Sequence, residues 1–290
     1  MTGGRLLLGV GIPTSTRPAV DPVAFAVRAE ELGFDFVSAP DHPAGTAPTF
    51  ETWTLLSWIA AATSRISIAP RVLGVPYRAP AMVAKMAEGF DRLSGGRLIL
   101  GLGAGSADDE HRAFGLGVRS PREKTTGLEE AITVIRGLWS TSGFSFRGEL
   151  YRTDDATIEP KPAHAIPIWL GTFAPRALAV TGRLADGWIP SLSYAGPDVI
   201  GGMRERVLEA ARRAGRDPAE ITCVYNVEVE LRDRPGRDTA RLVGPPAFVA
   251  ERIHGFAELG FSAFNVIVGD DPERLDELAA EVVPLLRTAA

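Results

Sequence analysis

Residues 94–105 read SGGRLILGLGAG, a short apolar run that leads into three alternating glycines. A dinucleotide-binding turn needs a different spacing, G-x-G-x-x-G at the start of a helix, inside a compact βαβ unit. After the glycines this chain continues with Ser106 and an acidic run, and the nearest good amphipathic helix begins near Arg122. The spacing therefore argues against a dinucleotide-binding strand and turn.

The stretch belongs to one of eight units in which a short apolar run precedes an amphipathic segment. Strict alternation of this kind predicts parallel strands joined by right-handed crossovers, and eight units favour a closed (β/α)8 TIM barrel. An open doubly wound sheet is the alternative. The expected strand and helix pairs are 6–12 and 22–32, 36–39 and 50–63, 66–71 and 79–93, 98–102 and 122–139, 168–171 and 174–184, 188–190 and 198–214, 221–229 and 247–259, and 264–268 and 272–286.

One long connection interrupts the alternation. Residues 140–167 lie between the fourth helix and the fifth strand and contain two strand-like pieces, 143–146 and 150–151. We expect this segment to be a small insertion on the barrel, not a linker. Because nothing else suggests a boundary, residues 1–290 are expected to form a single domain.

Composition excludes several classes of function. The chain has 290 residues, 45% of them hydrophobic, and a net charge of −5, which leaves no basic field for nucleic acid or a membrane surface. No apolar run reaches the roughly 18 residues of a membrane span, and the N-terminal stretch lacks the features of a signal peptide. The single cysteine, Cys223, fits a reducing compartment. We expect a cytoplasmic protein that acts on a small molecule.

Candidate catalytic groups are sought where the strands end, because barrel enzymes place their chemistry there. Asp41 and His42 follow the second strand, and Arg71 ends the third. Of the four histidines only His42 falls at a strand end, where an imidazole can donate a hydrogen bond or move a proton near neutral pH. The alternative is a histidine that only orders its loop through Asp41. Metal binding and nucleophilic acyl transfer lack the required motifs.

Two stretches at the same end of the barrel suggest a ligand with a flat ring and an anionic group. The glycines at 103 and 105 leave the mouth of the fourth strand without side chains, so that a ring can lie against backbone; the alternative is a tight turn. The segment GTFAPR at 171–176 ends a strand and starts a helix, whose free N–H groups can bind phosphate. Here the alternative is a threonine cap and a solvated arginine.

Several motifs, in order along nearly the whole chain, resemble the bacterial luciferase-like monooxygenase superfamily. Each piece is weak, but the combination is specific. The family fold is a (β/α)8 barrel with an insertion, in agreement with the unit count. The matching stretches are E-x-x-G-F-D-F-V at 30–37 with Asp41-His42, SGGRL at 94–98 with the glycines to 105, Glu110-His111, Phe114-Gly115, Leu138-Trp139, F-x-G-x-x-Y at 146–151, P-I-x-x-G at 167–171 running to Arg176, and G-R-x-A-D-G-W at 182–188.

The resemblance also points to a cofactor. Members that use flavin mononucleotide (FMN) resemble one another in an arginine at the position of Ala104, and they tend to carry Glu-Ser where this chain has Gly171-Thr172. Both differences favour the branch that uses the deazaflavin coenzyme F420. In that branch the resemblance implies a non-proline cis peptide within residues 69–73, under the deazaflavin ring.

Carried over by position, the resemblance assigns roles to several candidate residues. His42 lies beside the reactive edge of the ring as the catalytic group. Ser106 stands where members that oxidise sugar phosphates need a glutamate, which argues against a glucose-6-phosphate activity. The resemblance places Gly103, Ala104 and Gly105 along the ring or its side chain, and Gly171, Thr172 and Arg176 around the phosphate. From their positions at strand ends, Asp41, Pro70 and Arg71 are added to the expected cofactor-binding residues, and Ser106 to the expected pocket residues. Phe50, Trp53, Trp188 and Tyr194 are candidates for an apolar pocket wall, and the alternative for each is a place in the core.

The resulting hypothesis is an F420-dependent oxidoreductase. It would transfer hydride between the deazaflavin and a carbonyl, alcohol, imine or activated alkene, and the resemblance suggests a homodimer. One alternative keeps the fold but uses reduced FMN and oxygen as a monooxygenase. The other is a barrel that binds a cofactor or partner without turnover.

Overall fold

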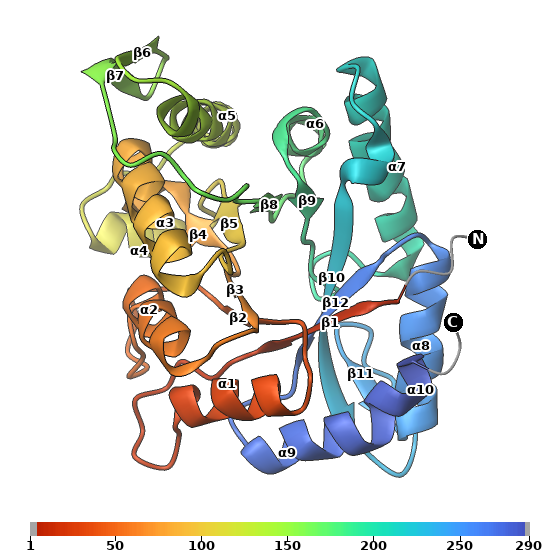
Figure 1. Cartoon of the computed structure of the whole chain (residues 1–290). Helices are drawn as coiled ribbons and strands as arrows, with labels where there is room; N and C mark the ends of the chain where they lie inside the picture. Colours follow the sequence, from red (N-terminus) through yellow and green to blue (C-terminus); the bar gives the residue numbers. More distant parts are fainter. Residues whose placement is uncertain (1–4, 288–290) are drawn as a thin grey trace.

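The computed structural model describes residues 5–287 and shows a barrel of parallel strands surrounded by helices (Figure 1). Eight strand positions form the barrel, because β3 and β4 are two halves of the third strand: β3 pairs with β2, and β4 pairs with β5. A bridge between Ile68 and Leu98 closes the circle. The expected TIM barrel is confirmed, and the open sheet was the wrong alternative. The barrel strands are β1 (Leu7–Gly11), β2 (Phe36–Ala39), β3 (Ser67–Pro70), β4 (Leu73–Gly74), β5 (Leu100–Gly103), β8 (Ile168–Leu170), β9 (Gly187–Trp188), β10 (Thr222–Leu231) and β12 (Ala263–Ile267).

The helices fill the outer layer, and most of them begin at a proline. Proline suits a first helical turn because its φ is fixed near the helical value and its missing N–H has no partner there anyway. In the described part of the chain, no helix is both long and apolar enough to cross a membrane. The helices are α1 (Pro22–Glu31), α2 (Thr52–Ala62), α3 (Pro80–Ser94), α4 (Asp108–Ala113), α5 (Pro121–Ser140), α6 (Pro175–Leu184), α7 (Pro197–Arg213), α8 (Pro246–Glu258), α9 (Pro272–Glu277) and α10 (Val283–Arg287), with a π-helical turn at Leu278–Val282 and 3-10 turns at Val75–Tyr77 and Pro218–Glu220.

The expected insertion is a hairpin of β6 (Phe144–Arg147) and β7 (Arg152–Ala156), beside α5. The second strand begins two residues later than expected. The reason is Glu130 of α5, whose carboxylate accepts hydrogen bonds from the backbone N–H groups of residues 149–151 at 2.5–2.9 Å. Because these N–H groups bind Glu130, residues 149–151 form the hairpin turn and do not belong to the strand. A further short strand, β11 (Leu242–Gly244), pairs with β10 outside the barrel circle.

The barrel interior below the carboxyl ends of the strands, on the side of their amino ends, is filled by apolar side chains. Phe36 and Trp169 meet edge to face with ring centroids 5.5 Å apart, and Val224 and Ala263 pack against them. Because side chains alternate along a strand, the next inward residues toward the carboxyl end of β10 and β12 are Asn226 and Asn265. The interior of the barrel is therefore apolar in this layer and becomes polar toward the carboxyl ends of the strands.

Glu30 of α1 ties the first helix to the start of the third strand. Its carboxylate accepts hydrogen bonds from the backbone N–H groups of Ser64, Arg65 and Ile66 at 2.8–3.3 Å. Burial alone would raise the pKa of Glu30, but these hydrogen bonds outweigh it and lower the pKa from 4.5 to about 2. Hydrogen bonding to a charged group is among the stronger polar contributions to folding.

We therefore expect the substitution Glu30→Gln to lower the free energy of unfolding at pH 7 by about 1–3 kcal/mol. A folded pKa below the unfolded value means that the stabilisation is present above about pH 4.5 and lost as the pH falls toward 2. The difference between wild type and variant should shrink over that window in urea titrations. Glu31→Gln, at a neighbouring exposed ion pair with Arg28, should change stability by less than about 1 kcal/mol. Equal effects of the two substitutions would contradict this role of Glu30.

Candidate cofactor and substrate site

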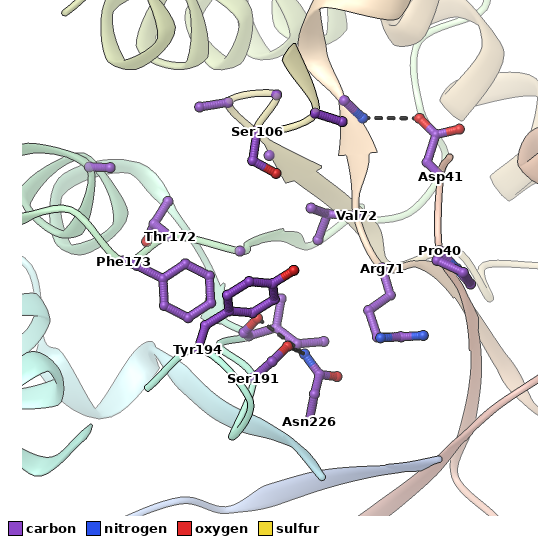
Figure 2. A pocket seen from close by; sticks show the side chains of 18 of the residues that line it. Pro40, Asp41, Arg71, Val72, Ser106, Thr172, Phe173, Ser191, Tyr194 and Asn226 are labelled. Carbon is purple, nitrogen blue, oxygen red and sulfur yellow. Dashed lines mark hydrogen bonds between the residues drawn. The ribbon is translucent and has the colours of Figure 1, made fainter. Parts of the chain in front are cut away.

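A cavity of about 620 Å³ opens where the barrel strands end (Figure 2). Its wall contains residues from the ends of several barrel strands. Gly103, at the end of β5, and Thr172, after β8, both line it. Most of the residues expected at the site from the sequence line this cavity. They are Asp41, His42, Arg71, Gly103, Ala104, Gly105, Ser106, Gly171, Thr172 and Tyr194.

The structure does not bring the other five expected residues, Phe50, Trp53, Pro70, Arg176 and Trp188, to the cavity wall. Trp188 is fully buried outside the barrel, because its neighbour Ile189 takes the inward position on the strand. Trp53 packs edge to face on Phe90, in the helix layer. Phe50 is 44% exposed, Arg176 is exposed in the first turn of α6, and Pro70 is buried within β3. These five side chains thus lie outside the cavity wall, and their expected roles in the pocket or at the cofactor stay predictions.

The third strand is broken at the cavity by a cis peptide bond between Arg71 and Val72, inside the range that the resemblance implied. At this point the backbone comes very close to β5. A Cβ on Gly101 would overlap the carbonyl oxygen of Pro70, and a Cβ on Gly103 would lie 2.6 Å from a methyl group of Val72. The alternating glycines therefore make room for the broken strand, which lets Val72 project into the cavity (Figure 2).

Asp41 fastens the broken strand to the end of β2. Its side chain is only 1% exposed and accepts a hydrogen bond from the backbone N–H of Gly74 at 3.0 Å. Arg78 donates to both of its carboxylate oxygens, at 2.7 and 3.0 Å. Burial alone would lower the pKa of Arg78, but the pair with Asp41 raises it. Both oxygens of Asp41 are thus occupied by the protein, and the residue shapes the cavity wall.

His42 is oriented by Glu110, not by Asp41. Its Nδ1 lies 2.7 Å from a carboxylate oxygen of Glu110, and Tyr77 donates its hydroxyl to the other oxygen, also at 2.7 Å. A carboxylate partner places the imidazole proton on Nδ1, so Nε2 carries the lone pair. Burial and the charge of Glu110 raise the pKa of Tyr77, which keeps its hydroxyl protonated. The three residues form a hydrogen-bonded chain from Tyr77 through Glu110 to His42, and His42 lines the cavity.

The short helix α4 supplies Glu110, which contacts His42 at the cavity wall. The acidic run after Ser106 was not expected to form a helix. His111 of this helix packs edge to face on Tyr77, with ring centroids 4.9 Å apart. Burial lowers the pKa of His111, so the ring is neutral in its packed position. Gly105 has a φ of +83°, and a Cβ there would lie 2.7 Å from His111, which explains the third glycine.

The start of α6 faces the cavity through Phe173, Ala174 and Ala177. Ala174 occupies the N-cap position and has no side chain that could accept from the first-turn N–H groups. Thr172 does not cap the helix either, because its hydroxyl is buried against that of Thr181 at 2.7 Å. The uncapped N–H groups and the positive end of the helix dipole are therefore available to an anion.

Two features complete the wall. The rings of Phe173 and Tyr194 lie side by side with centroids 5.4 Å apart, and Tyr194 is 80% exposed at the cavity (Figure 2). On another side, Lys124 of α5 lines the cavity and forms an ion pair with Asp108 of α4. The wall thus contains aromatic rings as well as a lysine that is paired with an aspartate of the same protein.

Residues that sequence reasoning missed are Val72, Tyr77, Lys124 and the role of Glu110. The contact between Glu110 and His42 joins residues 68 positions apart, and the acidic run offered no signal to single out one carboxylate. Ser191 and Asn226 also line the cavity.

Comparison with known proteins identifies the family. A family model described as luciferase-like monooxygenase matches residues 7–237. The chain belongs to this family. A relative from Kineococcus radiotolerans is 30% identical over 91% of this chain and 92% of its own, and one from Intrasporangium calvum is 32% identical over 91% and 94%. Both are named F420-dependent glucose-6-phosphate dehydrogenase.

A solved structure supports the fold of this luciferase-like chain. It is an F420-dependent secondary alcohol dehydrogenase in complex with an F420-acetone adduct, 21% identical in sequence. The two folds superpose with a TM-score of 0.87 over 98% of this chain and all of the other.

The close approach of β5 to the broken strand has a measurable consequence. We expect Gly101→Ala to lower the free energy of unfolding by about 3 kcal/mol or more, because the added Cβ overlaps a backbone oxygen that cannot rotate away. Gly89→Ala in α3 is the matched control, since nothing lies within 4 Å of its added Cβ. That change should raise stability by up to about 1 kcal/mol. Chemical denaturation of both variants tests the contact, and a neutral Gly101→Ala would contradict it.

Proposed function

We propose that this luciferase-like protein is an F420-dependent oxidoreductase that transfers hydride between the deazaflavin and a small alcohol or carbonyl compound, or an imine or activated alkene. The observation that carries the proposal is a free imidazole nitrogen, fixed by a carboxylate, in the same cavity as an uncapped helix start and a glycine-lined strand. The two relatives that match nearly end to end support the choice of cofactor.

The residues present fit such a cofactor. Gly103 and Gly171 have no side chain, and Val72 stands between them, so a flat ring finds an open surface. The N–H groups at the start of α6 suit the phosphate of the cofactor tail. When bound, the deazaflavin supplies the hydride acceptor or donor.

His42 handles the proton that accompanies the hydride. When an alcohol is oxidised, its carbon gives up a hydride with two electrons, and its hydroxyl proton passes to Nε2 of His42. Glu110 stabilises the imidazolium that results, and Tyr77 holds Glu110 in place. In the reverse direction, the same nitrogen returns the proton to the oxygen of the carbonyl. The hydride would go to the deazaflavin and the proton to His42, so the two transfers together account for the C–H and O–H bonds that break.

We expect a substrate other than the glucose 6-phosphate that appears in the names of the two relatives. Ser106 lines the cavity at the position where the resemblance expects a glutamate for oxidation of sugar phosphates. A serine hydroxyl cannot replace a carboxylate as a general base at neutral pH. We therefore infer that glucose 6-phosphate is not a substrate. We also propose that the protein is a homodimer and is located in the cytoplasm.

We expect His42→Ala to lower kcat about 10²- to 10⁴-fold in the reduction of F420 by an alcohol panel, with F420 affinity unchanged. Glu110→Gln should lower kcat by a smaller factor, because glutamine can still position the imidazole although it no longer supplies the negative charge. His254→Ala, a histidine of α8 away from the cavity wall, is the control and should have no effect. Turnover with reduced FMN and oxygen, and none with F420, would contradict the proposal.

The phosphate site can be tested by a change with two opposite effects. Ala174→Asp puts a carboxylate at the N-cap of α6, where it should stabilise the helix by about 1 kcal/mol and weaken F420 binding at least tenfold by repelling the phosphate. Gly196→Asp places the same group at the N-cap of α7, which does not line the cavity, and should leave F420 affinity unchanged. Fluorescence titration and thermal unfolding give the two readouts. Unchanged F420 affinity in Ala174→Asp would show that the phosphate binds elsewhere.

A further inference from the structure

Arg71 follows β3 and lines the cavity, and within residues 5–287 its side chain forms no hydrogen bond or ion pair. Its backbone N–H donates to Ala39, but among residues 5–287 no carboxylate lies within 4.0 Å of its guanidinium. Its Nε is sealed from solvent and makes no hydrogen bond. Burial lowers the pKa of Arg71 to about 10, still far above neutral pH, so the group is charged.

Each aspartate, glutamate, lysine and histidine side chain on the cavity wall has at least one hydrogen-bond or ion-pair partner within the described chain. Both oxygens of Asp41 bind Arg78, and Lys124 pairs with Asp108. His42 is hydrogen-bonded to Glu110, and Glu228 lies 3.5 Å from Arg241. Arg71 is partly buried, and a charge that is partly removed from water without a counter-charge costs free energy, which a ligand of opposite charge would offset. Within the described residues, Arg71 is therefore the charged group of the cavity wall that has no partner of opposite charge within 4.0 Å.

A second polar group of the cavity wall also lacks a partner. Asn226 is 3% exposed, and its Nδ2 donates to the carbonyl oxygens of Ile189 and Pro190 and to the hydroxyl of Ser191. These bonds fix the amide, which leaves its Oδ1 without a partner. Arg71, Ser191 and Asn226, here called the polar recess, lie on the same side of Val72 in Figure 2. The recess suits a ligand group that both carries charge and forms hydrogen bonds.

We propose that the polar recess binds a carboxylate of the substrate through Arg71, which makes the substrate class a small hydroxy acid or the oxo acid formed from it. This inference rests on the proposed function for the hydride step, but the recess itself does not. One guanidinium matches one negative charge and can hold a carboxylate through two parallel hydrogen bonds. A phosphate monoester would bring close to two charges, and the cavity wall offers no second unpaired cation among the described residues.

The test uses Arg71→Met, which removes the charge and keeps the length, and Arg71→Lys, which keeps the charge. Arg206→Met on the exposed face of α7 is the matched control. Each protein is mixed with 2-hydroxy acids from lactate to mandelate, with their neutral methyl amides, and with inorganic phosphate, at constant ionic strength. The readouts are the Tm of the protein, the affinity for each acid, and the affinity for F420.

The acids should raise the Tm of the wild type, whereas the amides should not. Arg71→Met should weaken acid binding at least about tenfold and leave F420 affinity within about twofold, and Arg71→Lys should retain part of the acid response. Without ligand, Arg71→Met should raise the Tm by about 2–4 °C, because an unmatched charge is removed; the control should not change it.

Three results would overturn the inference. A response to phosphate but not to the acids would indicate a dianion site, and no response to any acid would remove the site altogether. A tenfold loss of F420 affinity in Arg71→Met would assign the guanidinium to the cofactor. If the wild type binds the acids but not F420, the proposed function fails while the carboxylate site stands, so the two failures are distinguishable.

Discussion

The site depends on the contact between the third strand and β5, where the carbonyl oxygen of Pro70 occupies the space that a Cβ on Gly101 would need. Because β5 has no side chains at 101 and 103, the third strand can break between Arg71 and Val72 and still pair on both sides, with β2 before the break and β5 after it. The break turns Val72 into the cavity. A flat apolar surface is thereby created from backbone and a single side chain, at the end of a barrel whose interior is otherwise filled.

Around that surface the protein matches nearly all of its own charges. The Asp41 carboxylate is used to hold the broken strand, and the Glu110 carboxylate is used to orient His42. What remains available is a base at Nε2 of His42, a row of N–H groups at the start of α6, and the guanidinium of Arg71. These three groups differ in chemistry, and each suits a different part of the reaction: the proton, the anionic tail of the cofactor and the charge of the substrate.

The sequence was sufficient to predict the barrel, because eight alternating apolar patterns admit few other folds, and strand ends were sufficient to nominate His42, Arg71 and Thr172. Side-chain directions that depend on register were not predictable. Trp188 was expected in the pocket, but Ile189 takes the inward position and Trp188 packs outside. The pairing of Glu110 with His42 was not predictable from spacing either, since a six-residue helix brings it across the mouth of the barrel. Arg71 was nominated for the cofactor, but only the structure shows that it lacks a counter-charge.

The central claim is that the broken strand and the start of α6 together hold a planar redox cofactor. A crystal structure of the protein with F420 tests this most directly. The account predicts the ring packed on Val72, its phosphate hydrogen-bonded to the first-turn N–H groups of α6, and the His42 Nε2 next to the reactive edge. A complex in which the ring lies away from Val72, or the phosphate away from α6, would contradict it.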